Sequence, residues 1–164
     1  MTIFLETKRL IIRAPSLSDY NNWLVVHAES DEMQYPNEVV EAWLNHHILE
    51  FQQNGFSMGS VFLKDNNEFI GRAGLFYYSG AIAEKADIEI GYIIHKKYWN
   101  QGYATELAKA LIEWGFKNLS VSKIIALTRL DNKKSQHVLE KAGMQFVKKI
   151  QSEGEDFLLF EIYK

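Results

Sequence analysis

The chain has 164 residues, of which 47% are hydrophobic and 13% aromatic, enough apolar material for the core of one domain. Its formal net charge is −3, so it lacks the excess positive charge that binds a nucleic-acid backbone, and we expect no nucleic acid as a partner. The absence of cysteine excludes thiol nucleophiles, disulfides and zinc–thiolate sites. We predict one domain over residues 1–164. No apolar run has the length of a membrane span and the start lacks a signal-peptide pattern, so we expect a cytoplasmic protein with no membrane contact.

The first third of the chain predicts one strand and two helices. A short strand over Leu10–Arg13 ends before Pro15, which cannot donate a hydrogen bond to a sheet. Apolar residues at helical spacing predict helices over Tyr20–Ala28 and Asn37–Gln53. Ser18 stands where its side chain would cap the first of these helices.

The middle of the chain predicts an antiparallel meander followed by a helix and a parallel strand. Runs of β-branched and aromatic residues, separated by turn residues, lie over Phe56–Leu63, Phe69–Tyr78 and Ala83–Ile94. An amphipathic stretch over Thr105–Asn118 predicts a helix. The unbroken apolar run Ile124–Leu127 is typical of a strand that is covered on both faces.

The last part predicts a helix and a terminal pair of strands. Asn132 is placed to cap a helix over Lys133–Ala142, and Gly143 can adopt the left-handed conformation that ends it. Phe146–Ile150 and Phe157–Ile162 complete the sheet.

The turn from His95 to Thr105 is the first candidate binding site. It leads from a strand into a helix, so it presents unpaired backbone N–H groups and the positive end of the helix dipole. Gly102 and Ala104 are small enough to let phosphate oxygens reach the backbone. The turn is therefore either a pyrophosphate site or an ordinary connection that contains a glycine.

The next helix gives a second indication of an anion. Lys133 and Lys134 lie in its first turn, where the helix dipole disfavours cations unless an anion binds there. Both lysines are otherwise simply solvated. Asn132 either caps the Ser135 amide or faces a ligand together with Ser135.

The order of these segments resembles the GNAT superfamily of acyl-CoA-dependent N-acetyltransferases, especially its RimJ/RimL-like subgroup, which acetylates the N-termini of ribosomal proteins. The resemblance covers nearly the whole chain. It departs from the family pattern at Trp99, where the general motif has Gln or Arg. The segments that carry it are Glu6–Arg13, Ile88–Ile94, Tyr98–Glu106, Asn132–Ser135 and Leu139–Met144.

The resemblance implies a mixed α/β fold, with a twisted sheet of about seven strands that splays between the fourth and fifth, flanked by about four helices. It implies acetyl-CoA as cosubstrate and no metal. The pyrophosphate would bind the turn, the pantetheine arm would pair with the strand edge, and a backbone N–H near Ile93 would stabilise the oxyanion. The residues implied in cofactor binding are Tyr92, Ile93, Ile94, Gln101, Gly102, Tyr103, Ala104, Thr105, Asn132 and Ser135.

Acetyl transfer to an amine requires a base for the ammonium proton and a proton donor for the departing thiolate. Glu89 alternates along its strand with Ile88 and Ile90, and is either the base or an acidic residue on a solvated strand face. Ser135 is either the acid or an ordinary first-turn serine.

The acceptor is expected to be an amine on a small molecule or at a protein N-terminus, bound by a monomer or homodimer. Its candidate contacts are Trp23, His27, Tyr35 and Tyr77. Carboxylates near the first two helices favour a cationic acceptor, namely Glu29, Asp31, Glu32 and Glu38.

Two alternatives to a transferase are a non-catalytic acyl-CoA-binding regulatory domain and, more remotely, a serine hydrolase. The hydrolase hypothesis rests on Gly55–Gly59, which matches the G-x-S-x-G pattern with Ser57 as nucleophile. The strand expected directly after Ser57 argues against it. We expect no metal site, because the neighbours His46 and His47 do not share a helical face.

Overall fold

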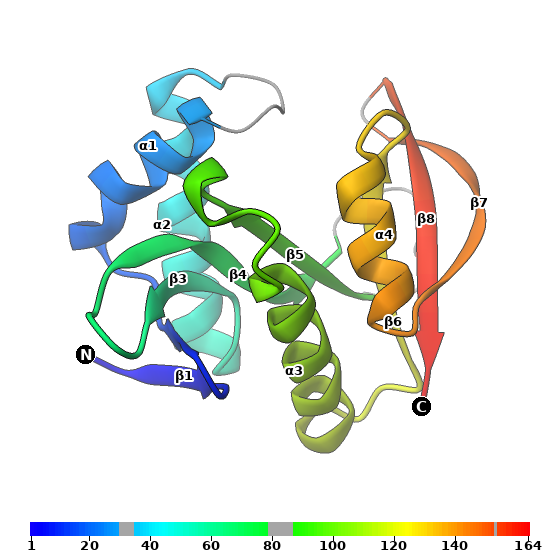
Figure 1. The fold of residues 1–164 in the computed structure, drawn as a ribbon, viewed down its shortest axis with the longest axis horizontal. Helices are drawn as coiled ribbons and strands as arrows, with labels where there is room; N and C mark the ends of the chain where they lie inside the picture. The colour runs from blue at the N-terminus through cyan, green and yellow to red at the C-terminus, as the bar shows by residue number, and fades with distance from the viewer. Residues whose placement is uncertain (30–34, 79–86, 153) are drawn as a thin grey trace.

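The computed structural model describes residues 1–29, 35–78, 87–152 and 154–164 and contains an eight-stranded mixed sheet with helices on both faces (Figure 1). The strands follow the order β1-β2-β3-β4-β5-β6-β8-β7, and every neighbouring pair is antiparallel except β5 and β6. The strands are β1 (Ile3–Glu6), β2 (Leu10–Arg13), β3 (Met58–Leu63), β4 (Phe69–Tyr77), β5 (Ile88–Ile94), β6 (Lys123–Arg129), β7 (Gln145–Ser152) and β8 (Glu155–Tyr163).

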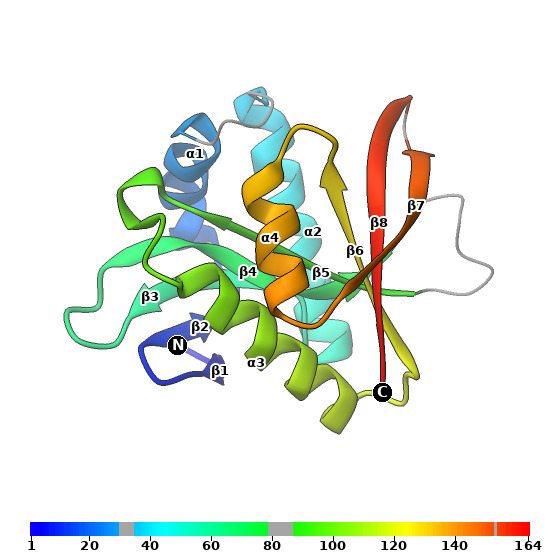
Figure 2. The same ribbon diagram turned by 45° about the vertical axis from the view of Figure 1, so that its right-hand side comes forward.

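Four α-helices and two short 3-10 turns connect these strands. The helices α1 and α2 pack over one face of the sheet, and α3 and α4 pack over the other (Figure 2). The helices are α1 (Tyr20–Glu29), α2 (Asn37–Asn54), α3 (Tyr103–Asn118) and α4 (Lys133–Lys141), and the 3-10 turns are Leu17–Asp19 and Lys96–Tyr98. None of the helices in the described part of the chain has the length and apolar character needed to cross a membrane.

The predicted elements are all present, and the sheet has one strand more than the seven expected. The additional strand is β1, which forms a hairpin with β2. Its turn lacks the Gly, Asn or Pro that usually marks a hairpin, and the side chain of Thr7 closes it instead by accepting the Leu10 N–H at 3.0 Å. The predicted start of the third meander strand at Ala83 lies outside the described residues.

The predicted cap at Ser18 is wrong. Ser18 lies inside the 3-10 turn that precedes α1, and Ser16 takes the capping position. The Ser16 backbone N–H donates to the Asp19 carboxylate at 2.9 Å, as in a capping box. The 3-10 turn before α1 was not predicted, and because of it the capping residue is Ser16, two residues before the predicted Ser18. At the other predicted caps, the Asn132 side chain accepts the Ser135 N–H, and Gly143 follows α4 with a φ of +94°.

The largest apolar cluster lies between the sheet and the α3–α4 layer. Helix α3 approaches the sheet closely at Gly115, where an added Cβ would lie 2.8 Å from Cδ1 of Ile124 and 3.0 Å from Cδ1 of Leu75. A second cluster, around Trp23, Leu44 and Met58, lies under α1 and α2. The sheet therefore has an apolar cluster on each face, and β5 contributes Ile88, Ile90 and Ile94 to the larger one.

The sheet opens between β5 and β6. Strands β4 and β5 are paired along their length from Gly71↔Ile94 to Tyr77↔Ile88, but β5 and β6 are paired only at Ile88↔Ile124 and Glu89↔Ile125. Beyond these pairs the two strands diverge, as both views show (Figures 1 and 2). The predicted splay between the Ala83–Ile94 and Lys123–Thr128 strands is therefore confirmed.

Candidate active site

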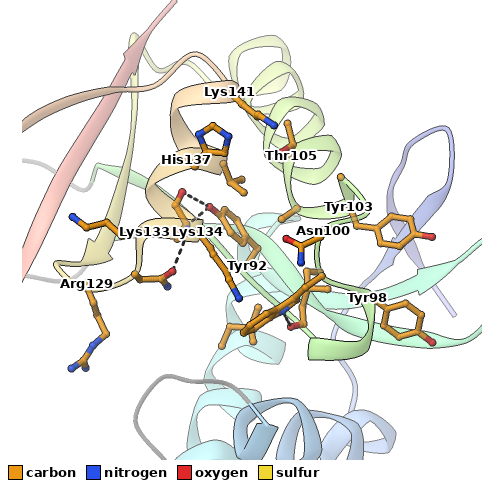
Figure 3. Close-up of a pocket in the computed structure, with 18 of the residues that line it drawn as sticks. Tyr92, Tyr98, Asn100, Tyr103, Thr105, Arg129, Lys133, Lys134, His137 and Lys141 are labelled. Carbon is orange, nitrogen blue, oxygen red and sulfur yellow. Dashed lines mark hydrogen bonds between the residues drawn. The ribbon is translucent and has the colours of Figure 1, made fainter.

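A cavity of about 700 Å³ lies at the splay, between β5, the start of α3 and the start of α4 (Figure 3). Nine of the ten residues predicted to bind the cofactor line it: Tyr92, Ile93, Ile94, Gly102, Tyr103, Ala104, Thr105, Asn132 and Ser135. The tenth, Gln101, is not part of the lining. Its side-chain amide donates to the Lys97 carbonyl at 3.2 Å, and its own carbonyl accepts Arg9 Nη1 at 2.9 Å. The turn and the second helix, which the sequence treats as separate indications, thus meet at one cavity.

The N-terminus of α3 faces this cavity with its backbone N–H groups free of side-chain caps. Gly102 is the N-cap, at a φ of +79°, and among the described residues no side chain caps the helix there. Because the first N–H groups of a helix have no partner within it, those of the α3 first turn are available to a ligand. Their dipole favours an anion.

Glu106, in the first turn of α3, would oppose an anion if its charge were free. Burial alone would raise the pKa of its carboxyl, but hydrogen bonds from Thr7 and Arg9 outweigh burial and hold the pKa below 4.5. Thr7 Oγ1 lies 2.6 Å from the carboxylate, and Arg9 Nε lies 2.7 Å from it. The β1–β2 hairpin therefore neutralises this charge and anchors the start of α3.

Beyond its pairing with β6, the edge of β5 carries amides that point away from β4. Tyr78 N–H donates to Asp87 O, and His95 N–H donates to Ile70 O, so the hydrogen-bonded pairs of this antiparallel ladder include Arg72 and Ile93. The alternation then points the N–H groups of Tyr92 and Ile94 away from β4. The oxyanion donor predicted near Ile93 is thus not the Ile93 N–H itself, and the neighbouring amides are the ones without a ladder partner in β4.

Helix α4 supplies polar groups to the opposite wall. Asn132 Oδ1 accepts the Ser135 N–H at 3.0 Å, and Ser135 Oγ lies 3.0 Å from the Tyr92 hydroxyl (Figure 3). The cap expected at Asn132 is therefore present, and Asn132 and Ser135 both line the cavity. Tyr92 and Ser135 form a hydroxyl pair that joins β5 to α4 across the splay.

Cationic side chains surround the cavity. Lys133, Lys134, Lys141 and Arg129 all belong to its lining (Figure 3). Trp99, at the position where the family motif has Gln or Arg, donates its indole N–H to the Ile94 carbonyl at 2.6 Å. Its ring lies 3.9 Å from Lys134 Nζ, a cation–π contact. The tryptophan thus positions a lysine of α4 beside the turn.

Glu89 points to the face of the sheet opposite Tyr92. Its neighbours Ile88 and Ile90 are buried in the α3–α4 core, and Glu89 is paired with Phe76 on the face that carries α1 and α2. Burial raises the pKa of its carboxyl to about 8, and the Leu127 backbone N–H limits the rise by favouring the charged form. The Glu89 side chain is half-buried, so it is less solvated than an acidic residue on an open strand face.

Three of the four residues predicted to bind the acceptor are buried or partly buried. Trp23 is fully buried and donates its indole N–H to Ser60 Oγ at 2.9 Å, so it belongs to the core. His27 is also buried, and burial followed by the charge of Arg72 lowers its pKa to about 3. Tyr35 is partly buried against Trp43, with ring centroids 4.5 Å apart.

Tyr77 lies on the face of the sheet opposite that of Glu89. It is paired with Ile88 and its ring packs 5.3 Å from that of Phe56, in the α3–α4 core. The alternation of β4 instead places Phe76 and Tyr78 on the Glu89 face. Of the acidic residues near the first helices, Glu29 is paired with His95 at 2.6 Å, and Asp31 and Glu32 lie outside the described residues.

A smaller cavity of about 190 Å³ lies over β6 and β8, and no local pattern in the sequence predicts it. Its lining includes Ile125, the register partner of Glu89, and Leu127, the amide neighbour of the Glu89 carboxyl. Tyr78 forms part of the wall, and Lys123 lies at the rim between Asp87 and Glu161, at 3.7 and 3.1 Å. Only the register between distant strands brings these residues together.

The hydrolase hypothesis is wrong. Ser57 is fully buried, and it lies between a preceding helix and a following strand, which is the reverse of the order in a nucleophile elbow. Its hydroxyl is engaged with His47 and Glu50 of α2.

Comparisons with known proteins agree with this geometry. The family described as acetyltransferase (GNAT) domain matches residues 9–145. The chain is 30% identical over 158 residues to the uncharacterized N-acetyltransferase YnaD of Bacillus subtilis, covering 93% of this chain and 91% of that protein. An acetyltransferase structure from Bacillus anthracis has a TM-score of 0.79 at 27% identity, covering 99% of this chain and 98% of the other. The structure of RimL, a ribosomal L7/L12 α-N-protein acetyltransferase in complex with coenzyme A, has a TM-score of 0.76 at 17% identity and covers 98% and 97%.

Proposed function

Because this chain belongs to the acetyltransferase (GNAT) family and is an acetyl-CoA-dependent N-acetyltransferase, we propose that acetyl-CoA binds in the splay between β5 and β6 and that Glu89 serves the amine on the opposite face. The observation that carries this proposal is the large cavity at the uncapped start of α3, beside the open edge of β5. It provides both the N–H groups for a diphosphate and a strand edge for an amide-containing arm.

In this arrangement the diphosphate accepts the first N–H groups of α3. The positive phosphate-binding surface is completed by the lysines of α4, including Lys134, which Trp99 holds in place. The pantetheine arm extends β5 by pairing with the amides of Tyr92 and Ile94. The thioester then lies where β5 and β6 separate, near Glu89 and the Tyr92–Ser135 pair.

The reaction is direct attack of a neutral amine on the thioester carbonyl. Glu89, as a carboxylate, takes the proton that the amine must lose, directly or through a water molecule, and its raised pKa matches this task near neutral pH. A β5 amide that points away from β4 stabilises the oxyanion. As the carbon–sulfur bond breaks, Ser135 donates its proton to the thiolate, and Tyr92 keeps the serine hydroxyl in position. Holding the two reactants together supplies much of the acceleration.

The acceptor is a primary amine, on a small molecule or at a protein N-terminus, that reaches Glu89 from the α1–α2 side. The smaller cavity beside Glu89 supports this direction of approach, since its walls are formed by Tyr78, Ile125 and Leu127. The fold similarity to RimL makes protein N-termini a natural class to include in the search.

Turnover with labelled acetyl-CoA tests this proposal. The purified protein is incubated with a panel of peptides with free N-termini and of small primary amines, and mass spectrometry locates the acetyl group. We expect label on a primary amine. Label retained in acetyl-CoA across the whole panel, although the protein binds CoA in calorimetry, would contradict the catalytic assignment and favour the non-catalytic acyl-CoA-binding domain.

A further inference from the structure

A group of side chains that could bind a metal ion lies on α2, in the part of the helix next to β3. One ring nitrogen of His46, one of His47 and a carboxylate oxygen of Glu50 all lie within 4.8 Å of one another. Within the described ranges, this is the one group of His, Cys, Asp or Glu side chains so arranged. Adjacent residues on a helix point about 100° apart, and for this reason the sequence predicts no metal site at His46 and His47. In the structure, however, both imidazoles turn toward Glu50 on the next turn of the helix.

The distances suit one tetrahedral ion. Glu50 Oε2 lies 3.1 Å from His47 Nδ1 and 3.5 Å from His46 Nε2. Two nitrogen or oxygen ligands about 2.1 Å from a tetrahedral Zn²⁺ are themselves about 3.4 Å apart. Two imidazoles and one carboxylate are also a donor set that Zn²⁺ accepts in proteins, with water at the remaining position.

The surroundings fix the carboxylate and leave one side open. Ser57 is fully buried, and its hydroxyl donates to Glu50 Oε2 at 3.1 Å, which is the kind of outer contact that orients a metal ligand. The Glu50 side chain is 12% exposed and that of His47 is 10% exposed, whereas the His46 side chain is 64% exposed. An ion can therefore enter from the His46 side and retain a water molecule there.

We propose that His46, His47 and Glu50 form a Zn²⁺ site on α2, beside Ser57, which directly precedes β3. The site is separate from the acetyl-CoA cavity, since none of its residues lines that cavity. The ligand set with the ion carries a net charge of +1, and the nearby Arg72 is positive as well. We therefore expect weaker binding than at a site with thiolate ligands.

The test uses chelator-treated full-length protein titrated with Zn²⁺ in competition with a chromogenic zinc indicator. We expect one Zn²⁺ per chain and a rise in the midpoint of thermal unfolding on zinc addition. His46→Ala should weaken the binding at least about tenfold, because it removes one of three protein ligands, and should abolish the thermal shift. Because the His46 side chain is exposed, its removal leaves the core intact, and Asn45→Ala, at the exposed neighbouring residue, is the matched control.

Glu50→Gln gives a second test, because the amide keeps the size of the side chain and loses its charge. It should bind Zn²⁺ more weakly than Asn45→Ala does. Absence of stoichiometric zinc binding in the wild-type protein would overturn the proposal and leave the cluster as a hydrogen-bonded contact between α2 and Ser57. Equal affinity in the wild-type protein and in His46→Ala would overturn it as well.

Discussion

Glu89 acquires its chemistry from its position where the two halves of the sheet separate. Its register partner Ile125 forms the last β5–β6 pair, and its half-buried side chain shares a face of the sheet with Phe76, its partner in β4. Desolvation disfavours the charged form and raises its pKa to about 8. The same residue type on the solvated edge of a sheet would be a weak base at every pH of interest.

Replacing Glu89 by Gln should lower kcat by about 10²- to 10⁴-fold, the usual contribution of a general base. In the wild-type protein the base is active only when deprotonated, so kcat/KM should rise with pH and level off above about pH 8. The acceptor amine also titrates, but its ionisation is common to both proteins. The difference between the two pH profiles, measured with one acceptor, therefore isolates Glu89, and identical profiles would contradict its role.

The same pKa shift affects stability. Folded Glu89 keeps its proton up to about pH 8, whereas a carboxyl in the unfolded chain loses it near 4.5, so the unfolded state binds fewer protons between these values. The Glu89 contribution to the free energy of unfolding should thus fall as pH rises from about 4.5 to about 8. Urea unfolding of Glu89→Gln should lack this decline.

Ser135→Ala should lower kcat by up to about 10²-fold and leave the KM for acetyl-CoA nearly unchanged, because the hydroxyl acts on the leaving thiolate. Tyr92→Phe should have a smaller effect, and combining it with Ser135→Ala should add little, since the two hydroxyls contact each other at 3.0 Å. Steady-state kinetics measures these changes, with the exposed Ser122→Ala as control. Full kcat in Ser135→Ala would exclude it as the acid.

At the scale of elements, the start of α3 is the most consequential feature. Gly102 begins the helix without a side-chain cap, and the β1–β2 hairpin neutralises Glu106 through Arg9. Helix α4 approaches the same cavity from the other half of the sheet and brings Ser135 to Tyr92. One helix N-terminus and one strand edge thus form a surface that neither would provide alone.

Ala104→Leu should weaken binding of CoA at least tenfold without loss of helix stability. Leu is nearly as good a helix former as Ala, but its side chain would occupy space at the cavity wall where a diphosphate approaches the backbone. Isothermal titration calorimetry measures the affinity. Ala42→Leu, which adds the same side chain at an exposed position of α2, should bind CoA like the wild-type protein. Unchanged affinity in Ala104→Leu would place the diphosphate elsewhere.

At the scale of the molecule, the large cavity lies between the two halves of the sheet, which share only two register pairs between β5 and β6. Acetyl-CoA bound there, as proposed, would link the two halves. A ligand that binds the folded state alone stabilises it by about 2.7 kcal/mol at a hundred times its Kd. For a chain of this size, that corresponds to a rise of roughly 5–10 °C in Tm. We expect acetyl-CoA to produce this shift in the wild-type protein and in Glu89→Gln, but a smaller one in Ala104→Leu. A thermal scan that gave equal shifts in all three would argue against the cavity as the binding site.

The sequence by itself determined the order of elements and one side of the site. Periodicity and turn residues predicted the helices and the strands from β2 to β8, because these signals are local in the chain. The uncapped turn around Gly102 and the cap at Asn132 were predicted for the same reason, since each depends on residues within one turn. The strand β1 was missed, because the Thr7 side chain closes its hairpin in place of a turn residue.

Only the tertiary structure decided which side chains meet. Tyr92 and Ser135 are 43 positions apart, and the pairing of Glu89 with Phe76 and Ile125 depends on the register of three strands. A change of one residue in that register exchanges the faces of a strand, and the observed register gives Phe76 and Tyr78, not Tyr77, the same face as Glu89. Trp23 and His27 are residue types that often line binding sites, but in the structure both side chains are buried in the core. Burial and register depend on contacts between distant residues, and no local pattern encodes them.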